Sequence, residues 1–360
     1  MIHYFDSAAA SRPEPEVLNF YFEAMQDDFA NQEAQHQLAY QARRHLEQAA
    51  RLLTSSLLGE PDKFDVIWAT SATECFRIIA QFFQNKTVIS SHLEHPALLA
   101  NFKRFTNLEL LKNNSSGQII LPDNPLKAAA FIVHHVQSET GVIQNLEPLR
   151  CNFPEATAMS DTVQSAARIA LPEKLDLYIV SGIKFGAPGG AAIMFKRSAP
   201  ALKKFPAFAA DMRSLDYALS RINVPLCRAL AFAADLRSKR MAEDFKKVSE
   251  LQQYLADSMK QAGIMPLLPP GITTTPYITN FFLPGVQAAV IVRTLSQAGV
   301  HCASGSACAA EAGGPSPSLL ALGKSREDGF SGLRISLDHT ITVNDIDFLV
   351  SELKTALKNY

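Results

Sequence analysis

The sequence predicts an α/β protein in which helices cover both faces of a largely parallel sheet and a smaller α+β domain follows. Short runs rich in β-branched and aromatic residues alternate with helical patterns, and most of these runs are apolar along nearly their whole length. Strands of that kind are typical of parallel sheets buried on both faces. A helical pattern then extends from Pro225 to about Gly263 without internal glycine. A helix longer than about 25 residues is typical of a link between domains or of support for a second one.

The expected elements follow in chain order. Six runs have strand character, at 64–70, 86–91, 128–136, 156–161, 175–181 and 191–197. Helical patterns between them cover 72–83, 96–105 and 164–169. After the long helix, strands are expected within 276–285 and 332–337, and helices at 287–298 and 343–357. Ligands of open parallel sheets bind at the carboxyl ends of the strands, so the polar residues after each strand are the functional candidates.

Composition excludes several classes of function. Of the 360 residues, 47% are hydrophobic, and 34 basic residues nearly balance 35 acidic ones, which excludes disorder and a global field that attracts nucleic acid. The first residues lack the pattern of a secretory signal, and no apolar run approaches the ~20 residues of a membrane span. Five cysteines form no disulfide framework, which is typical of a reducing compartment. Together these observations lead us to expect a cytoplasmic protein with neither membrane nor nucleic-acid partners.

Three strand ends carry groups suited to a ligand, although each also has a plain structural interpretation. The segment 70–74 opens a helix, whose first N–H groups suit a phosphate but are equally compatible with an ordinary N-cap. His95 is suited to stacking on a planar cofactor or moving protons, yet a lone loop histidine usually does neither. No third ligand accompanies His92 and His95, so no metal is expected. Ser138 lies in a segment that offers hydrogen bonds or forms a simple turn.

Asp161 and Lys184 end two further strands and form a more specific pair. A lysine among glycines at a strand end suits a Schiff base with a carbonyl cofactor. An aspartate one strand away is suited to keeping a pyridine nitrogen protonated. The alternative, an exposed lysine and a capping aspartate, fits the spacing equally well.

Taken in order, these segments resemble the pyridoxal-phosphate enzymes of the class V aminotransferase group, and most closely the cysteine desulfurases. The resemblance covers nearly the whole chain, and its motifs stand in the family's order. They are Tyr4 to Ala9, Asn31, His36, ATSATE (69–74), EHPALL (94–99), QSETGVIQ (137–144), SDTVQSA (160–166), SGIKFGAPGG (181–190), ASGSAC (303–308) and LRISL (333–337).

The resemblance implies a fold-type I transferase with a mainly parallel seven-stranded sheet in a large domain and a small α+β C-terminal domain. The expected division is an N-terminal segment 1–15 that packs with the small domain, a large cofactor-binding domain 16–240 and a small domain 241–360. The small domain would hold the catalytic-cysteine loop 302–318. A homodimer is implied as well.

The resemblance also implies a role for each matching residue. The cofactor, pyridoxal 5′-phosphate, would be bound covalently by Lys184. Asp161 would contact its ring nitrogen, Gln164 its phenolate oxygen, and His95 would stack on the ring and relay protons. The phosphate would be held by Ala72, Thr73 and Ser181, and Ser138 stands in place of the usual asparagine near the cofactor. Arg334 would bind the substrate carboxylate, and Asn31 and His36 belong to the N-terminal active-site segment. Lys184, Cys308 and His95 would be catalytic.

Cys308 matches the family's catalytic cysteine, and its Gly/Ser/Ala-rich loop suits a thiol that must travel. Cys75, Cys151 and Cys227 are expected to be buried and inert, and Cys302 structural. The implied reaction takes sulfur from L-cysteine as a persulfide on Cys308, gives L-alanine and passes the sulfur to an acceptor protein. Two alternatives remain open, another class V aminotransferase or lyase such as a selenocysteine lyase, and a non-catalytic relative that acts as an interaction protein. The second is motivated by Ile183, which replaces the family's usual histidine, and by a missing Gly-Thr motif near Asn223.

Overall fold

The structure is a computed structural model that describes residues 2–215, 222–305 and 314–360. The prediction for Cys308, together with most of its loop, lies outside these residues.

Seven strands form the central sheet in the order β2-β8-β7-β6-β5-β3-β4. They are β2 (Phe64–Ala69), β3 (Thr87–Ser91), β4 (Asn107–Leu111), β5 (Ala130–His134), β6 (Thr157–Asp161), β7 (Leu177–Ser181) and β8 (Ala191–Lys196). β8 runs antiparallel to β2 and β7, and the other neighbouring pairs are parallel. The mainly parallel seven-stranded sheet is therefore confirmed. The six predicted strands are present, and the seventh, β4, is a half-exposed edge strand with little apolar signal.

The central strands are buried on both faces, which explains their apolar sequences. Every residue of β5, β6 and β7 is buried. In β5, Phe131 and Val133 join one hydrophobic cluster, whereas Ala130 and Ile132 join another on the opposite face. This alternation follows from the two-residue repeat of a strand.

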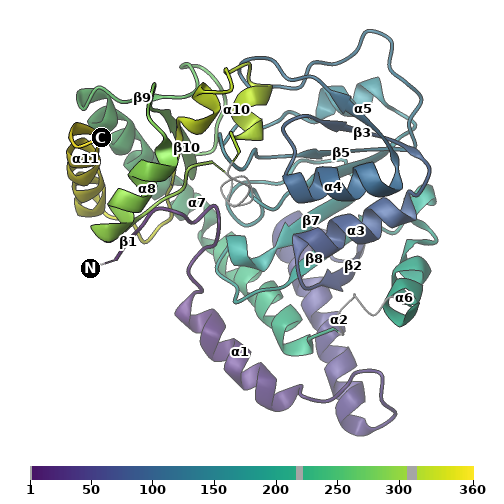
Figure 1. Cartoon of the computed structure of the whole chain (residues 1–360). Coiled ribbons are helices and arrows are strands. Elements are labelled where there is room, and N and C mark those ends of the chain that lie inside the picture. The colour runs from purple at the N-terminus through teal and green to yellow at the C-terminus, as the bar shows by residue number, and fades with distance from the viewer. Residues whose placement is uncertain (1, 216–221, 306–313) are drawn as a thin grey trace.

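Helices cover both faces (Figure 1). One face carries α3 (Ala72–Phe82), α4 (Pro96–Phe105) and α6 (Phe205–Leu215). The other carries α1 (Pro15–Asp27), α2 (Gln37–Leu58) and the first half of α7 (Val224–Gln261). A short helix, α5 (Glu147–Asn152), lies between β5 and β6 along the chain.

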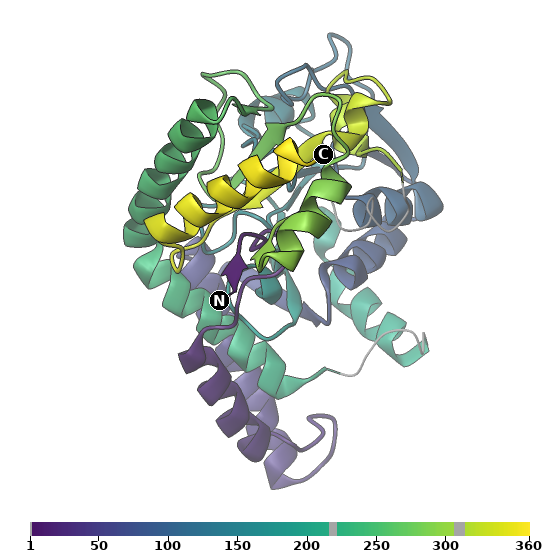
Figure 2. The same cartoon turned by 60° about the vertical axis from the view of Figure 1, so that its left-hand side comes forward.

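The second half of α7 supports a smaller α+β unit, as predicted. Its antiparallel sheet has the order β12-β10-β9, and its strands are β9 (Met265–Pro266), β10 (Ile278–Phe282) and β12 (Gly332–Ser336). Figure 2 shows the C-terminal helix α11 (Val343–Lys358) beside α8 (Ala288–Gln297). A short helix, α10 (Pro317–Ala321), precedes β12. These elements bury a third hydrophobic cluster of their own.

The N-terminal segment connects this smaller unit to the central sheet. β1 (His3–Tyr4) pairs in parallel with β11 (Val300–His301), and Asp6 forms a bridge to Ser336. The chain then crosses toward the carboxyl end of β7, where the Ser11 N–H donates to Ile183 O at 2.7 Å. The N-terminal segment thereby lies over the strand ends predicted to carry the site.

The helix predicted at 164–169 is wrong, because this segment forms consecutive turns. Ala167 has φ +57°, in the left-handed region that a helix interior does not admit. The turns are closed by main-chain bonds from Ala166 N to Thr162 O and from Ile169 N to Ser165 O. Among the described residues, no helix combines the length and the apolar character that crossing a membrane requires.

Candidate active site

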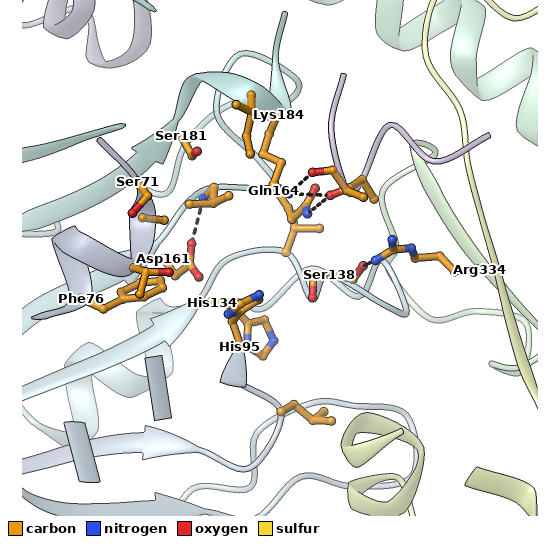
Figure 3. A pocket seen from close by; sticks show the side chains of 18 residues that line it. Ser71, Phe76, His95, His134, Ser138, Asp161, Gln164, Ser181, Lys184 and Arg334 are labelled. Atoms are coloured by element: carbon orange, nitrogen blue, oxygen red, sulfur yellow. Dashed lines mark hydrogen bonds between the residues drawn. The ribbon is translucent and has the colours of Figure 1, made fainter. Parts of the chain in front are cut away.

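A cavity of about 290 Å³ lies at the carboxyl ends of the central strands, between the large sheet and β12. Figure 3 shows its lining. The structure brings together nine of the predicted site residues there: Ala72, Thr73, His95, Ser138, Asp161, Gln164, Ser181, Lys184 and Arg334.

Lys184 follows β7 at the end of a single 3-10 turn, Gly182–Lys184. This turn is tight, since a Cβ on Gly182 would lie 2.5 Å from Gly189 O, which explains the glycine. The Lys184 Nζ donates to the main-chain oxygen of Ala8 at 3.0 Å and also to that of Ala9. Burial, with help from Arg168 and Arg334, lowers the pKa of Lys184 to about 8. A useful fraction of the amine is therefore neutral, the form that attacks a carbonyl.

This lowered pKa predicts how cofactor capture depends on pH. Burial disfavours the ammonium form, so the neutral amine appears at lower pH than in an ordinary lysine. We expect the rate at which cofactor-free protein takes up pyridoxal phosphate to rise with pH and to level off above a pKa of about 8. Stopped-flow absorbance over the pH range measures this rate, and the same series with a free lysine derivative corrects for ionisation of the cofactor. A rise centred near the ordinary value of 10.5 would contradict the assignment.

Asp161 ends the neighbouring strand β6, and its carboxylate faces the same cavity. Its Oδ1 accepts the Val163 N–H at 3.0 Å. Burial raises the pKa of Asp161 to about 6, although the Val163 N–H and the positive Lys184 act in the opposite direction. A buried carboxylate of this kind gains from a cationic ring nitrogen, which would restore its charged form.

His134 lines the same cavity and was not among the predicted site residues. It is the register partner of Asp161 in the parallel pair β5–β6, so both side chains project from the same face. The His134 Nδ1 lies 2.9 Å from Glu94 Oε1, and Glu94 Oε2 accepts the His134 main-chain N–H at 2.8 Å. Counting alternate positions along β5, β6 and β7 places His134, Asp161 and Ser181 on one face, a signal in the sequence that can identify this histidine.

The N-terminus of α3 forms another side of the cavity. Ser71 caps this helix, because its Oγ accepts the Glu74 N–H at 3.2 Å, so the plain N-cap interpretation is correct as far as Ser71 goes. Ala72 and Thr73, the first two residues of α3, still line the cavity. The N–H groups of a helix's first turn have no acceptor within the helix and suit an anion.

His95 caps α4 and faces the cavity as a neutral ring. Its Nδ1 accepts the Ala97 N–H at 3.1 Å, which leaves the proton of a neutral imidazole on Nε2. Burial and the nearby Lys184 lower the pKa of His95. The ring is therefore suited to lie against an aromatic group and to exchange a proton.

Arg334 enters the cavity from β12 of the smaller unit. Its guanidinium donates to Asp6 Oδ1 at 2.7 Å and to Ser138 O at 3.0 Å, and only 3% of the residue is exposed. Arg334 also binds the start of the predicted cysteine loop, since it exchanges two main-chain hydrogen bonds with Ala303. The far end of that loop is held by Ser316, whose Oγ donates to Glu139 Oε2 at 2.6 Å. Both ends of the loop are thus fixed next to the cavity.

Asn31 and His36 do not line the cavity. The Asn31 Oδ1 accepts the Glu33 N–H at 3.2 Å, and the His36 Nδ1 accepts the Ala39 N–H and caps α2. Their assignment to substrate binding stays a prediction.

The cysteines that the structure describes differ in exposure. Cys75 and Cys227 are buried as predicted, whereas Cys151 is exposed, because the short helix α5 lies at the surface. Cys302 is buried, and burial raises the pKa of its thiol to about 12, which disfavours a reactive thiolate.

The donor groups of the cavity fit pyridoxal phosphate. An aldehyde would meet a lysine of lowered pKa, a ring nitrogen a buried carboxylate, and a phosphate the first N–H groups of α3. In the described part of the chain, no group of three or more histidine, cysteine or acidic residues is arranged to hold a metal ion.

Comparisons with known proteins agree with this geometry. The sequence profile of the family described as Aminotransferase class-V matches residues 3–349. The cysteine desulfurase IscS of Vibrio vulnificus (strain CMCP6) is 24% identical, over 99% of this chain and 92% of its own length. The solved structure of a NifS-like protein from Rickettsia africae has a TM-score of 0.85 at 21% identity, covering 99% of this chain and 100% of its own. SspA, solved in complex with cysteine, has a TM-score of 0.72 at 19% identity, covering 93% and 98%.

The profile match extends over nearly the whole chain, and the predicted lysine, aspartate and helix N-terminus converge on one cavity. The chain therefore belongs to the class V aminotransferase family of pyridoxal-phosphate-dependent enzymes.

Proposed function

We propose that the protein is a cysteine desulfurase, which takes the sulfur of L-cysteine as a persulfide on Cys308 and releases L-alanine. The observation that carries the proposal is the attachment of the cysteine loop. Its first residues are hydrogen-bonded to Arg334, the cavity residue best suited to bind a carboxylate. The similarity to relatives named cysteine desulfurase, and to a structure with bound cysteine, supports the same substrate.

Arg334 orients the substrate in this proposal. Its planar guanidinium suits a carboxylate, and its contacts with Asp6 and Ser138 O keep the side chain in place. A substrate carboxylate held there would place the amino acid in the cavity, beside Ala303 at the start of the cysteine loop.

The bound cofactor supplies an electron sink for the bonds around the substrate Cα. Lys184 holds the cofactor and afterwards moves the Cα proton, a task suited to an amine with a pKa of about 8. Asp161 keeps a positive charge on the ring nitrogen, and His95 covers the ring and assists proton movement.

The sulfur step uses Cys308. Its thiolate forms a bond to the substrate sulfur while the Cβ–S bond breaks, and the electron pair of that bond stays with the substrate carbon. That carbon takes up a proton to give alanine, and Cys308 keeps the sulfur as a persulfide. An acceptor protein or a small thiol then removes it.

We also propose a homodimer, with α1, α2 and their connection at the contact. This part of the chain exposes large apolar side chains, with 56% of Phe22, 72% of Phe29 and 54% of Tyr40 accessible. Surface of this kind is typical of a protein interface. Asn31 and His36 lie in the same part of the chain, so a second copy would bring its own Asn31 and His36 to the contact.

The test is a product analysis of cofactor-loaded protein given L-cysteine and excess reducing thiol. The proposal predicts alanine and sulfide in equal amounts. Pyruvate with ammonia, or transfer of the amino group to a keto acid, would reject it in favour of another class V reaction. Strong preference for selenocysteine would assign the protein as a selenocysteine lyase. Absence of turnover together with absence of cofactor binding would support a non-catalytic relative.

A further inference from the structure

Arg168 is a buried arginine that contacts several parts of the site without lining the cavity. It lies in the turns after Asp161, and only 2% of the residue is exposed. Its guanidinium donates through Nη1 to Gln164 Oε1 at 3.1 Å, and through Nη2 to Ser7 O at 3.0 Å and Ser11 Oγ at 3.1 Å. The guanidinium carbon also lies 5.4 Å from the ring centre of Tyr277.

Within the described ranges, the positive charge of Arg168 has no acidic partner at close range. Among the ion pairs of the described residues, none joins Arg168 to a carboxylate. Burial, with help from Arg237 and Arg334, lowers the pKa of Arg168 to about 10, whereas Tyr277 and Asp338 act in the opposite direction. A buried cation without a paired anion is costly, so it is retained where it has a purpose or where an anion joins it.

Arg168 determines which way the amide of Gln164 points. The Gln164 Oε1 accepts from Arg168, and the Gln164 Nε2 donates to Ala8 O at 2.8 Å. Rotating the amide would set its NH2 group against the guanidinium, donor facing donor. The amide nitrogen carries two protons, and only one is used by Ala8, so the other is left for the cavity that Gln164 lines. Figure 3 shows Gln164 between the N-terminal segment and the cavity.

The same arginine reaches Lys184 through the N-terminal segment. Ser11 accepts from Arg168 and donates its own hydroxyl proton to Lys184 O at 2.7 Å. Ser7, Ala8 and Ala9 provide the carbonyl groups that bind Arg168, Gln164 and Lys184. The charged groups that act on the Lys184 amine are Arg168, Arg334, Asp6 and Asp161, and Arg168 has the largest effect of these four, lowering its pKa.

We propose that Arg168 is a positioning residue for cofactor binding. It holds the Gln164 amide with an N–H toward the cavity, where the cofactor's phenolic oxygen would accept it, and it supplies a fixed positive charge behind that amide. It also ties the N-terminal segment to the loop that carries Lys184. The inference rests on the proposed roles of Lys184 and Gln164 in holding pyridoxal phosphate, and not on the choice of cysteine as substrate.

The test compares Arg168→Met, which removes the charge, with Arg168→Lys, which keeps the charge but not the forked hydrogen bonds. The first measurement uses cofactor-free protein and follows the pH dependence of Lys184 labelling by an amine reagent, read by peptide mass. Loss of a nearby like charge is expected to raise the apparent pKa of Lys184 by roughly one unit in Arg168→Met. Arg168→Lys is expected to stay close to the wild-type value.

The second measurement is the equilibrium binding of pyridoxal phosphate. Arg168→Met is expected to weaken binding by about 10-fold or more, since a charge-assisted contact is lost, with an intermediate loss for Arg168→Lys. Arg237→Met is the matched control: it removes another buried arginine, paired with Glu14 and Asp244, and should lower stability without moving the Lys184 titration.

Wild-type binding and wild-type Lys184 titration in both Arg168 variants would overturn the proposal. If Arg168→Met does not fold, Arg168→Lys alone decides, because unchanged cofactor affinity in that variant rejects the positioning role. If the protein fails to release sulfide from cysteine, the Lys184 titration and the cofactor-binding measurement still test the role of Arg168. Failure of wild-type protein to attach the cofactor at Lys184 would instead appear before any Arg168 variant is made.

Discussion

Replacing Lys184 by alanine is expected to abolish covalent attachment of pyridoxal phosphate and to reduce turnover by about 10⁴-fold or more. The reason is that, among the residues that the structure describes, Lys184 is the one lysine that lines the cavity. Its amine is buried near Asp161 and has a pKa lowered to about 8. The measurement is the visible absorbance of the lysine-bound cofactor, followed by borohydride reduction and identification of the modified peptide.

Lys127→Ala is the control for this prediction, because Lys127 is an exposed lysine in an irregular segment and does not line the cavity. It should keep the wild-type absorbance and the wild-type modified peptide. Reduced cofactor found on any lysine other than Lys184, or full absorbance in Lys184→Ala, would show that the cavity is not the cofactor site.

Replacing Cys308 by alanine is expected to leave the cofactor absorbance intact and to lower sulfide release from cysteine by at least about a thousandfold. In the proposed site the absorbance would depend on Lys184 and Asp161, whereas the sulfur step would need a thiolate at the substrate sulfur. The rate is measured as sulfide and alanine formed per bound cofactor, with the wild-type protein and Cys308→Ala loaded with cofactor to the same extent.

Cys151→Ala is the matched control, since Cys151 is exposed and is therefore able to react adventitiously. It should release sulfide at the wild-type rate. Retained release in Cys308→Ala would refute the assignment of the nucleophile, and loss in Cys151→Ala would reassign it.

Much of the fold could be predicted because its strands are buried on both faces. Segments such as 128–136 and 175–181 are apolar for that reason, and the prediction of strands there is confirmed. The long helix was equally clear, since α7 runs from Val224 to Gln261 as one uninterrupted element. β4 was missed because an edge strand has one exposed side and no continuous apolar run.

The segment after Asp161 shows where local patterns fail. Its small residues resemble a helix in sequence, yet Ala167 takes φ +57°. The turns that result carry Arg168 to Ser7 and Ser11, more than 150 positions earlier in the chain. A contact between residues this far apart in the sequence is made by the tertiary fold, and no periodic pattern in the sequence predicts it.

The candidate site likewise contains residues that the sequence predicts and residues that it does not. Residues at strand ends, such as Asp161 and Lys184, could be predicted because parallel strands bring their carboxyl ends together. His134 was missed because its place in the cavity follows from its register with Asp161, which appears only when neighbouring strands are counted together. The predicted domain boundaries and the role of Cys308 stay predictions.

The most direct test of the proposed reaction is the mass of the Cys308 peptide after one turnover. Cofactor-loaded protein is mixed with L-cysteine without added reductant. Its thiols are then blocked, and the masses of its peptides are measured by mass spectrometry. The proposed mechanism predicts that the peptide bearing Cys308 is heavier by one sulfur atom and that an equal amount of alanine is released. Alanine or sulfide formed while the Cys308 peptide stays unmodified, with the extra sulfur absent or on another cysteine, would contradict it.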